Sequence, residues 1–302
     1  MAFRPLPTLG TKYLLKPGGQ VGLLTSYAQL GLMKVSFAVD LAALPHATGG
    51  LEVCLYRSNP GRAGDQSNPV VGTGYSPVLV ASADWIDPVP VDDGNGGYVD
   101  VVNRYPISWN VGADWSGPVV AVGLRIPSGS VVASYLLPSP VDISSVGVIV
   151  IPRNSLTVRI QGEMVIPSIG SAMLQYLFGK GTDPLSRPSA GVYVAQLLSA
   201  PAYDGTLVEA SGGGYSRRLM EGTRLEVIDD GVGAVARLQA GQAIVFAASA
   251  NDWTGPWTHA IICRDLVGAN GLYTLEHPAP VTPPPSGESH SIIGSSISWR
   301  LV

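Results

Sequence analysis

The hexapeptide ADWSGP at residues 113–118 returns as NDWTGP at residues 251–256. Four other stretches return with it in the same order, and each pair lies 138 to 141 residues apart. A nearly constant offset over five stretches indicates one domain of roughly 135 residues that occurs twice in tandem. The other pairs are GGLEVCLYRSNP (49–60) and AGVYVAQLLSAP (190–201), GTGYS (72–76) and GGGYS (212–216), LPSPV (137–141) and HPAPV (277–281), and NSLTVRI (154–160) and SSISWRL (295–301).

The composition fits a protein whose surface is covered by neighbours. Hydrophobic residues make up 46% of the 302-residue chain, and charged residues make up only 13%. Interfaces are depleted of charge at their centres, and a weakly charged free surface tends to associate. The net charge of -4 provides no basic surface, so nucleic acid is not an expected partner.

No part of the sequence is expected to enter or cross a membrane. No stretch approaches the run of about 18 apolar residues that a membrane span needs. Pro5, Pro7 and Pro17 lie where a signal peptide would need an apolar core. We therefore expect a protein that is made and used without secretion.

The two cysteines do not occupy matching positions in the repeats. Cys54 aligns with Ala195, and no cysteine of the first half aligns with Cys263. The sequence thus predicts two buried free thiols and no duplicated disulfide.

The repeat and the proline pattern divide the chain into four segments. The first is expected to be an extended arm, because its prolines fix φ and remove backbone donors. Pro5, Pro7 and Tyr13 are its candidate attachment residues, and the arm is expected to become ordered on a partner. The segments are the arm (1–22), domain 1 (23–161), a linker (162–170) and domain 2 (171–302).

Apolar residues that alternate with polar ones predict a mainly β protein. Ser171 is the candidate cap of a short helix over 171–178 at the start of domain 2, and no counterpart is expected in domain 1. Short strands separated by turns favour two tandem antiparallel β-sandwich domains, jelly-roll-like in topology. Strands are expected at 35–41, 51–56, 119–126, 131–137, 146–151 and 156–160, and at 192–198, 206–210, 216–220, 224–228, 234–238, 243–248, 257–263, 271–275 and 297–301.

The Asp-Trp pair is the best polar feature shared by the repeats. Asp114-Trp115 and Asp252-Trp253 could be two equivalent binding sites, each a carboxylate beside an indole on which a glycan ring stacks. The alternative is structural: the aspartate supports a turn through a bond to backbone, and the tryptophan packs into the core. The structural interpretation is favoured, because a duplicated fold keeps its turns whether or not it binds a ligand.

The second shared feature is a glycine-rich stretch that ends in tyrosine, at Tyr75 and Tyr215. A phosphate-binding loop would need a strand before it and a helix after it. Here the residues after the stretch predict a strand, so a turn or bulge is expected.

Nothing in the sequence selects catalytic, metal-binding or cofactor-binding residues. The four histidines do not recur between the repeats and lack metal-ligand spacing. No GxSxG elbow is present, and the acidic pairs 92–93 and 229–230 lack the alternating oxygen ligands of a calcium loop. Arg217-Arg218 is expected on a solvated or interface surface, and Thr282–Pro285 is expected to form a stiff loop.

The second half also carries an ordered series of short motifs. They are SAMLQYLFGKG (171–181), PSAGVYVAQLLSAPAYDGT (188–206), VEASGGGYSRRLM (208–220), NDWTGPWTHAII (251–262), GLYTLEHPAPV (271–281) and SIIGSSISWRLV (291–302). Their order resembles a domain of bacteriophage virion proteins, described as tail-fibre-like or head-decoration proteins. The first half keeps only the GTGYS, ADWSGP and closing-strand parts. The resemblance implies a non-enzymatic virion component, often a homo-oligomer such as a trimer, with no catalytic residues.

The expected function is therefore that of a non-enzymatic bacteriophage virion structural protein, a capsid decoration or cement protein assembled in the host cytoplasm. Its partners would be major capsid or tail proteins. The alternative is a tail-fibre or baseplate-associated protein that binds a host surface glycan through Trp115 and Trp253. A glycosidase is not favoured, because the 22 acidic residues show no spacing that selects a catalytic pair.

Overall fold

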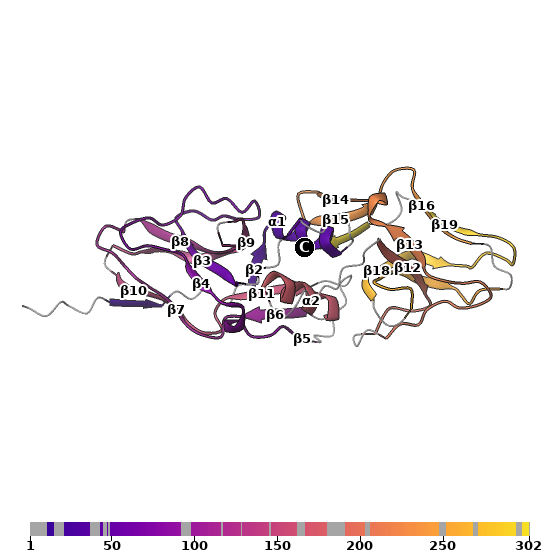
Figure 1. The fold of residues 1–302 in the computed structure, drawn as a ribbon, viewed down its shortest axis with the longest axis horizontal. Coiled ribbons are helices and arrows are strands. Elements are labelled where there is room, and N and C mark those ends of the chain that lie inside the picture. Colours follow the sequence, from indigo (N-terminus) through magenta and orange to yellow (C-terminus); the bar gives the residue numbers. More distant parts are fainter. Residues whose placement is uncertain are drawn as a thin grey trace, which may run out of the picture. The chain divides into compact units, whose positions relative to one another are not determined.

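The computed structural model describes a mainly β protein with two α-helices in the described residues (Figure 1). The chain divides into two compact units, which are described separately. Unit 1 comprises residues 1–27, 47–87 and 101–159, and unit 2 comprises residues 28–46, 88–100 and 160–302. The described residues are 11–14, 21–36, 43–44, 47, 49–91, 98–115, 117–127, 129–144, 146–161, 167–179, 191–202, 206–247, 252–267, 271–293 and 298–301.

Unit 1 is built on two sheets formed by strands of the first repeat. Strands run in the order β4-β3-β8-β9-β2-β11 in the larger one and β1-β10-β7 in the smaller one. Most neighbours are antiparallel, but β2 is parallel to β11 and β1 is parallel to β10. The strands are β1 (Thr11–Leu14), β2 (Val21–Leu24), β3 (Leu51–Tyr56), β4 (Val78–Val80), β7 (Ile107–Asn110), β8 (Pro118–Arg125), β9 (Val131–Asp142), β10 (Val146–Ile151) and β11 (Thr157–Gln161), with a 3-10 turn η1 (Ser82–Asp84).

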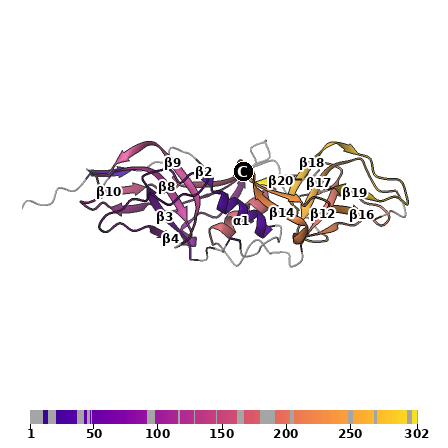
Figure 2. The same cartoon turned by 90° about the horizontal axis from the view of Figure 1, so that it is seen from above.

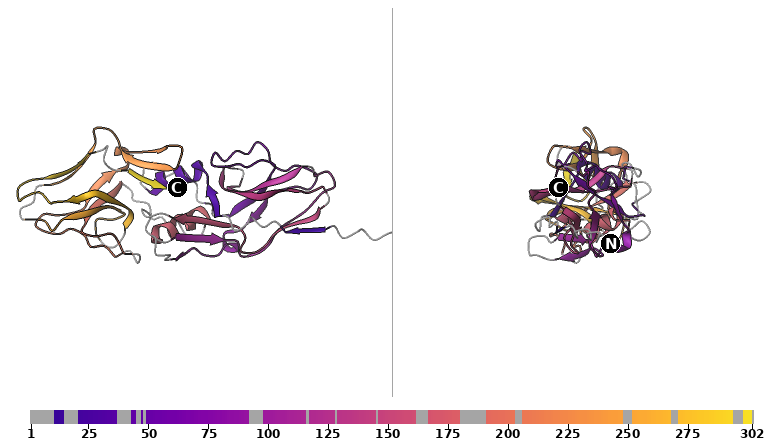
Figure 3. Two further views of the ribbon diagram at one scale, coloured as in Figure 1. Left: turned by 180° about the vertical axis from the view of Figure 1, so that it is seen from behind. Right: turned by 90° about the vertical axis from the view of Figure 1, so that its left-hand side faces the viewer.

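Unit 2 contains the strands of the second repeat in three sheets, ordered β13-β12-β17-β18, β14-β15-β20 and β16-β19. Its largest sheet, brown to yellow in Figure 3, is antiparallel throughout. The elements are β12 (Gly191–Leu197), β13 (Arg218–Glu221), η2 (Gly222–Arg224), β14 (Leu225–Asp229), β15 (Ala234–Leu238), β16 (Ala243–Phe246), β17 (Trp257–Cys263), β18 (Gly271–Val281), β19 (His290–Ile293) and β20 (Ser298–Leu301).

The two repeats share their strand order. The four-strand run β4-β3-β8-β9 of unit 1 has the same order along the chain as β13-β12-β17-β18 of unit 2. The antiparallel pair β7 and β10 likewise corresponds to β16 and β19. Even the 3-10 turns correspond, since η1 and η2 each follow the edge strand.

Unit 2 also takes in parts of the first repeat. These are most of the helix α1 (Ser26–Ser36) and the antiparallel strands β5 (Val89–Val91) and β6 (Tyr98–Val102). The helix α2 (Pro167–Leu177) contacts β5, and its Tyr176 hydroxyl donates a hydrogen bond to the Leu44 carbonyl at 2.6 Å. The compact units therefore do not follow the segment boundaries expected from the repeat.

Helix α1 corrects the expectation of a strand at 35–41 and of a first repeat without a helix. It begins at Ser26 and ends at Ser36, and α2 occupies the same place in the second repeat. Ala28, Leu32 and Val35 are fully buried, which is the i, i+4, i+7 spacing of a helix face. The alternation that begins at Val35 starts only at the helix end, and residues 37–42 lie outside the described part.

The N-terminal segment also differs from a free arm. Residues 11–14 and 21–24 are strands of unit 1, and Tyr13 pairs with Ile149 of β10. The backbone of Tyr13 is thus paired within its own chain, and an attachment role for Tyr13 stays a prediction. The other two candidate attachment residues, Pro5 and Pro7, lie outside the described residues.

Most expected strands are present, and the differences have local causes. The segment 206–210 forms no strand and contributes only an isolated bridge from Glu209 to Leu197. Seven strands were not expected, because runs of three to five residues are too short to show a period. They are β1, β2, β4, β5, β6, β7 and β19. Strands β9 and β18 extend beyond the expected ends through LPSPV and HPAPV. The expected helix over 171–178 is α2, which begins earlier, at Pro167.

Each unit has a core of large side chains. Trp85, Tyr56 and Tyr135 are fully buried in unit 1, as are Trp257 and Phe246 in unit 2, among others. The two cysteines are free and buried, as predicted. Burial raises the pKa of the Cys54 thiol to about 11 and that of the Cys263 thiol to about 12. Among the described residues, no helix is long and apolar enough to cross a membrane.

Candidate functional site

The residues shared by the repeats form one corner in each unit. In unit 1 the backbone N–H of Leu55, in β3, donates to the Tyr75 hydroxyl at 2.8 Å. In unit 2 the N–H of Gln196, in β12, donates to the Tyr215 hydroxyl at 2.7 Å. Burial raises the pKa of both phenols, so both stay neutral at physiological pH. Each tyrosine therefore fastens its glycine-rich turn to the central strand of a sheet.

A tryptophan closes each corner. The Trp115 indole donates to the Thr73 carbonyl at 2.9 Å, and the Trp253 indole donates to the Gly213 carbonyl at 3.1 Å. Each ring meets the corner tyrosine edge to face at 81°, with centroids 5.1 Å apart in unit 1 and 5.9 Å apart in unit 2. Edge-to-face packing of this kind adds to the gain from burial.

This geometry corrects the glycan-stacking hypothesis. Trp115 is 2% exposed and Trp253 is 5% exposed, so neither indole offers a face on which a sugar could stack. Both indole N–H groups are also taken by backbone carbonyls. The two tryptophans act as core residues of their turns, as the structural interpretation proposed.

Glycine is required where each turn approaches its tryptophan. Gly72 has a φ of +151°, and a Cβ there would lie 2.4 Å from Cδ1 of Trp115. Gly212 has a φ of +132°, and a Cβ there would lie 2.6 Å from the Asp252 carbonyl oxygen. Few other residues adopt this backbone conformation, and none fits the space. The glycine-rich stretch is thus a turn, and a strand follows it in each repeat.

The two aspartates have different roles although each directly precedes the repeated tryptophan. The Asp114 carboxylate accepts the Thr73 N–H at 2.8 Å and the Thr73 hydroxyl at 2.7 Å. These hydrogen bonds, that of the hydroxyl foremost, hold the pKa of Asp114 below its usual value. In unit 2 Thr254 performs this task, since its hydroxyl accepts the Ser211 N–H at 2.8 Å.

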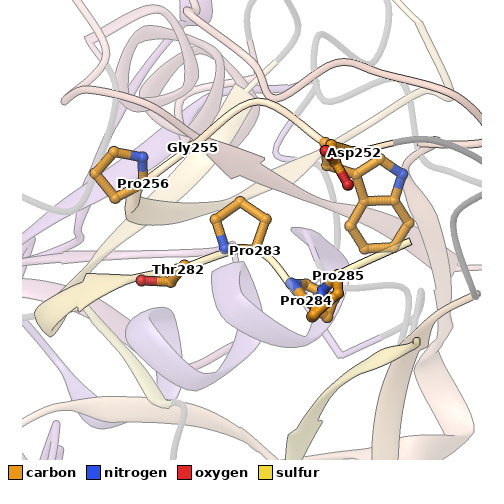
Figure 4. A pocket seen from close by; sticks show the side chains of 8 residues that line it. Asp252, Gly255, Pro256, Thr282, Pro283, Pro284 and Pro285 are labelled. Carbon is orange, nitrogen blue, oxygen red and sulfur yellow. The ribbon is translucent and has the colours of Figure 1, made fainter. Parts of the chain in front are cut away.

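The Asp252 carboxylate therefore does not bond the backbone of the turn. Its side chain is exposed, and in the described part of the chain it has no hydrogen-bond partner. It lines an open groove of about 450 Å³ in unit 2 (Figure 4). Figure 4 shows the rings of Pro283, Pro284 and Pro285 along one side of this groove. The groove is lined by Asp252, Trp253, Gly255, Pro256, Thr282, Pro283, Pro284 and Pro285.

The histidines of unit 2 form a half-buried group around β18. Nε2 of His277 lies 2.8 Å from Oε1 of Gln196, and the His290 ring packs edge to face on Trp257 at 5.0 Å. Burial lowers the pKa of both His277 and His290, and for His277 the charges of His290 and His259 lower it further. Among the described residues, no group of three or more His, Cys, Asp or Glu side chains could hold a metal ion. His46 lies outside them.

Two other polar pairs have structural partners. Arg217 was expected on a solvated or interface surface, but it is 6% exposed, and its guanidinium bonds Glu209 at 2.8 Å and the Asp265 carbonyl at 2.8 Å. Asp229 and Asp230 accept backbone N–H groups of the turn that follows them. The other acidic pair, 92–93, lies outside the described residues.

Comparison of the chain with protein-family models, with curated proteins and with solved structures finds no match.

Proposed function

We propose that this chain is a non-enzymatic structural protein of a bacteriophage particle, displayed on its surface as a capsid decoration or cement protein. The proposal rests on one observation: the residues that both repeats retain are structural. The tyrosine, tryptophan and glycine of each corner hold a turn onto a sheet, and the tryptophans are buried. Duplication therefore preserved a scaffold, which suits a protein that occupies and covers a surface.

The surface chemistry supports the same proposal. Only 13% of the residues are charged, and large apolar side chains in both units are exposed, among them Val71 at 53% and Val267 at 75%. Apolar surface that lacks charge is typical of the centre of protein interfaces. Its partners would be major capsid or tail proteins, together with further copies of the chain. The resemblance of residues 171–302 to virion domains points to the same class of partner.

A cement protein stabilises its particle by binding the assembled state only. The test compares particles made with and without this chain for the temperature at which they release their genome. We expect particles without it to open at a lower temperature and purified protein to restore the difference. Equal opening temperatures would contradict the cement role.

The groove of unit 2 favours a second candidate, a tail protein that binds a host surface glycan. Asp252 offers an acceptor for sugar hydroxyls, and the proline rings offer apolar surface, without any need for an exposed indole. The test is a glycan array probed with the wild-type protein and with Asp252→Asn. This candidate predicts bound glycans that the variant loses, whereas an array without bound glycan argues against it.

A further inference from the structure

The N-terminal strand β1 covers one edge of the smaller sheet of unit 1. It runs parallel to β10, with Lys12 beside Val148, Tyr13 beside Ile149 and Leu14 beside Val150. On its other side β10 pairs with β7. Strand β10 is therefore a central strand, and both of its rows of backbone groups have partners.

Strand β19 is the counterpart of β10 in the second repeat, but it has one covered side only. It pairs with β16, which corresponds to β7 and is labelled next to β19 in Figure 2. In this pair Ile292 lies beside Ile244 and Ser291 beside Val245. In the described part of the chain no strand lies on its other side. The backbone groups of that edge thus lack the partner that β1 gives to β10.

In the described residues, β1 is the one strand that covers an edge of this kind, and it covers β10. The residues that lie 141 positions after β1 are Pro152–Ser155, and they form the turn between β10 and β11. They cannot serve the second repeat, because they already connect two strands of the first. The described residues therefore offer no second strand equivalent to β1 for the β19 edge.

The β19 edge lacks the features that keep edge strands from pairing. Native proteins protect such edges with charged residues or proline within the strand. The sequence of β19 is HSII, and burial lowers the pKa of His290, so the strand is uncharged at neutral pH. Ser291 is exposed, so the strand is accessible to solvent at its middle.

We propose that the β19 edge is an attachment site that takes up an extended segment of a neighbouring protein as a parallel strand, as β10 holds β1. That the neighbour is a capsid or tail protein rests on the proposed function. Strand addition draws its affinity from backbone hydrogen bonds, so the segment needs an extended, proline-free stretch with apolar side chains. A second copy is a poorer donor, because its β1 would have to leave β10 and no strand pair would be gained.

The test uses a fluorescent peptide of residues 9–16, LGTKYLLK, as the donor and the full-length protein as the acceptor. We expect saturable binding with one peptide per chain, measured by anisotropy. Hydrogen exchange should slow at residues 290–292 and stay unchanged in β10. A peptide with Tyr13→Pro, which cannot complete the ladder, should bind at least tenfold more weakly.

Matched variants of the exposed Ser291 test the site on the acceptor. Ser291→Lys places a charge on the edge and should weaken peptide binding about tenfold, whereas Ser291→Thr should bind like the wild type. Unchanged binding to Ser291→Lys, or protection in β10 in place of β19, would overturn the proposal. So would a dimer of the peptide-free protein that Ser291→Lys converts to monomer, because the occupant would then be a second copy.

Measurements on the particle itself test the attachment role of the β19 edge separately from the proposed function. Particles carrying Ser291→Lys should hold fewer copies of the protein than particles carrying Ser291→Thr. Full occupancy by Ser291→Lys would overturn the edge as the attachment site and leave the virion role standing. Absence of even the wild-type protein from particles would contradict the virion role itself.

Discussion

The corners of the two units share their tyrosine, tryptophan and glycine and differ in the side chain that bonds the backbone of the turn. In unit 1 Asp114 holds Thr73, and in unit 2 Thr254 holds Ser211 while Asp252 faces an open groove. The buried parts of the corner, the tyrosine and the tryptophan, keep the same bonds in both. Duplication thus preserved the scaffold and left one exposed carboxylate available for another use.

The largest expected effect comes from removing the shared indoles. Trp115→Ala and Trp253→Ala should each lower the free energy of unfolding of their unit by about 3–5 kcal/mol, because each leaves a large cavity. Urea denaturation followed by circular dichroism measures the loss. A Trp253→Ala protein that kept its stability would show that the two corners are not equivalent.

The corner tyrosines should give a smaller and equal effect. Tyr75→Phe and Tyr215→Phe each leave a backbone N–H of a central strand without its acceptor, at a cost of about 1–3 kcal/mol. The same denaturation experiment compares them. Unequal losses would mean that one hydroxyl contributes little to its corner.

Substitution of the two aspartates should affect the stability of the two corners differently. Asp114→Asn should lower the melting temperature, because it replaces one of the two carboxylate oxygens that accept from Thr73 by an NH2 group, which cannot accept, and removes the charge. Asp252→Asn should leave the melting temperature unchanged. The pKa of Asp114 is lowered on folding, so its contribution is present above the unfolded value of 3.8 and is lost as pH falls through the folded value. Calorimetry at pH 7 and below pH 3 checks this. A melting-temperature loss for Asp252→Asn equal to that of Asp114→Asn would contradict the comparison.

The smallest effect concerns the thiols. Burial raises the pKa of Cys54 to about 11 and that of Cys263 to about 12, and the thiolate is the reactive form. We expect neither to react with iodoacetamide at pH 8 in the folded protein and both to react in urea. Mass spectrometry of the folded and the urea-treated samples measures the modification. Modification of one cysteine in the folded protein would show that its unit opens more readily than the other.

Sequence patterns predicted many of the parts that are repeated in register, but not β4, β7 or α1 of the first repeat. The corner glycines, tyrosines and tryptophans, the buried cysteines and most strands were all predicted. Helix α1 was missed because the alternation from Val35 onward suggested a strand, and Gly31 in the middle of the segment argued against a helix. Gly31 is there for packing, since a Cβ would lie 2.6 Å from the Leu44 Cβ.

The candidate site was predicted less well, because equivalent residues of the two repeats have different hydrogen-bond partners. Asp114 and Asp252 each precede the repeated tryptophan. The partner of Asp114, Thr73, corresponds to Gly213, which has no hydroxyl to donate. Thr254 bonds Ser211 in the second repeat, where the first repeat has a serine at position 116, and these two differences were the available signal. The pairing of Arg217 with Glu209 and the open edge of β19 depend on contacts across the chain that periodicity does not report.

The most direct test of the proposed virion role is a quantitative protein analysis of purified phage particles. We predict that this chain is present on the head in a fixed ratio to the major capsid protein. Its absence from purified particles would contradict the account.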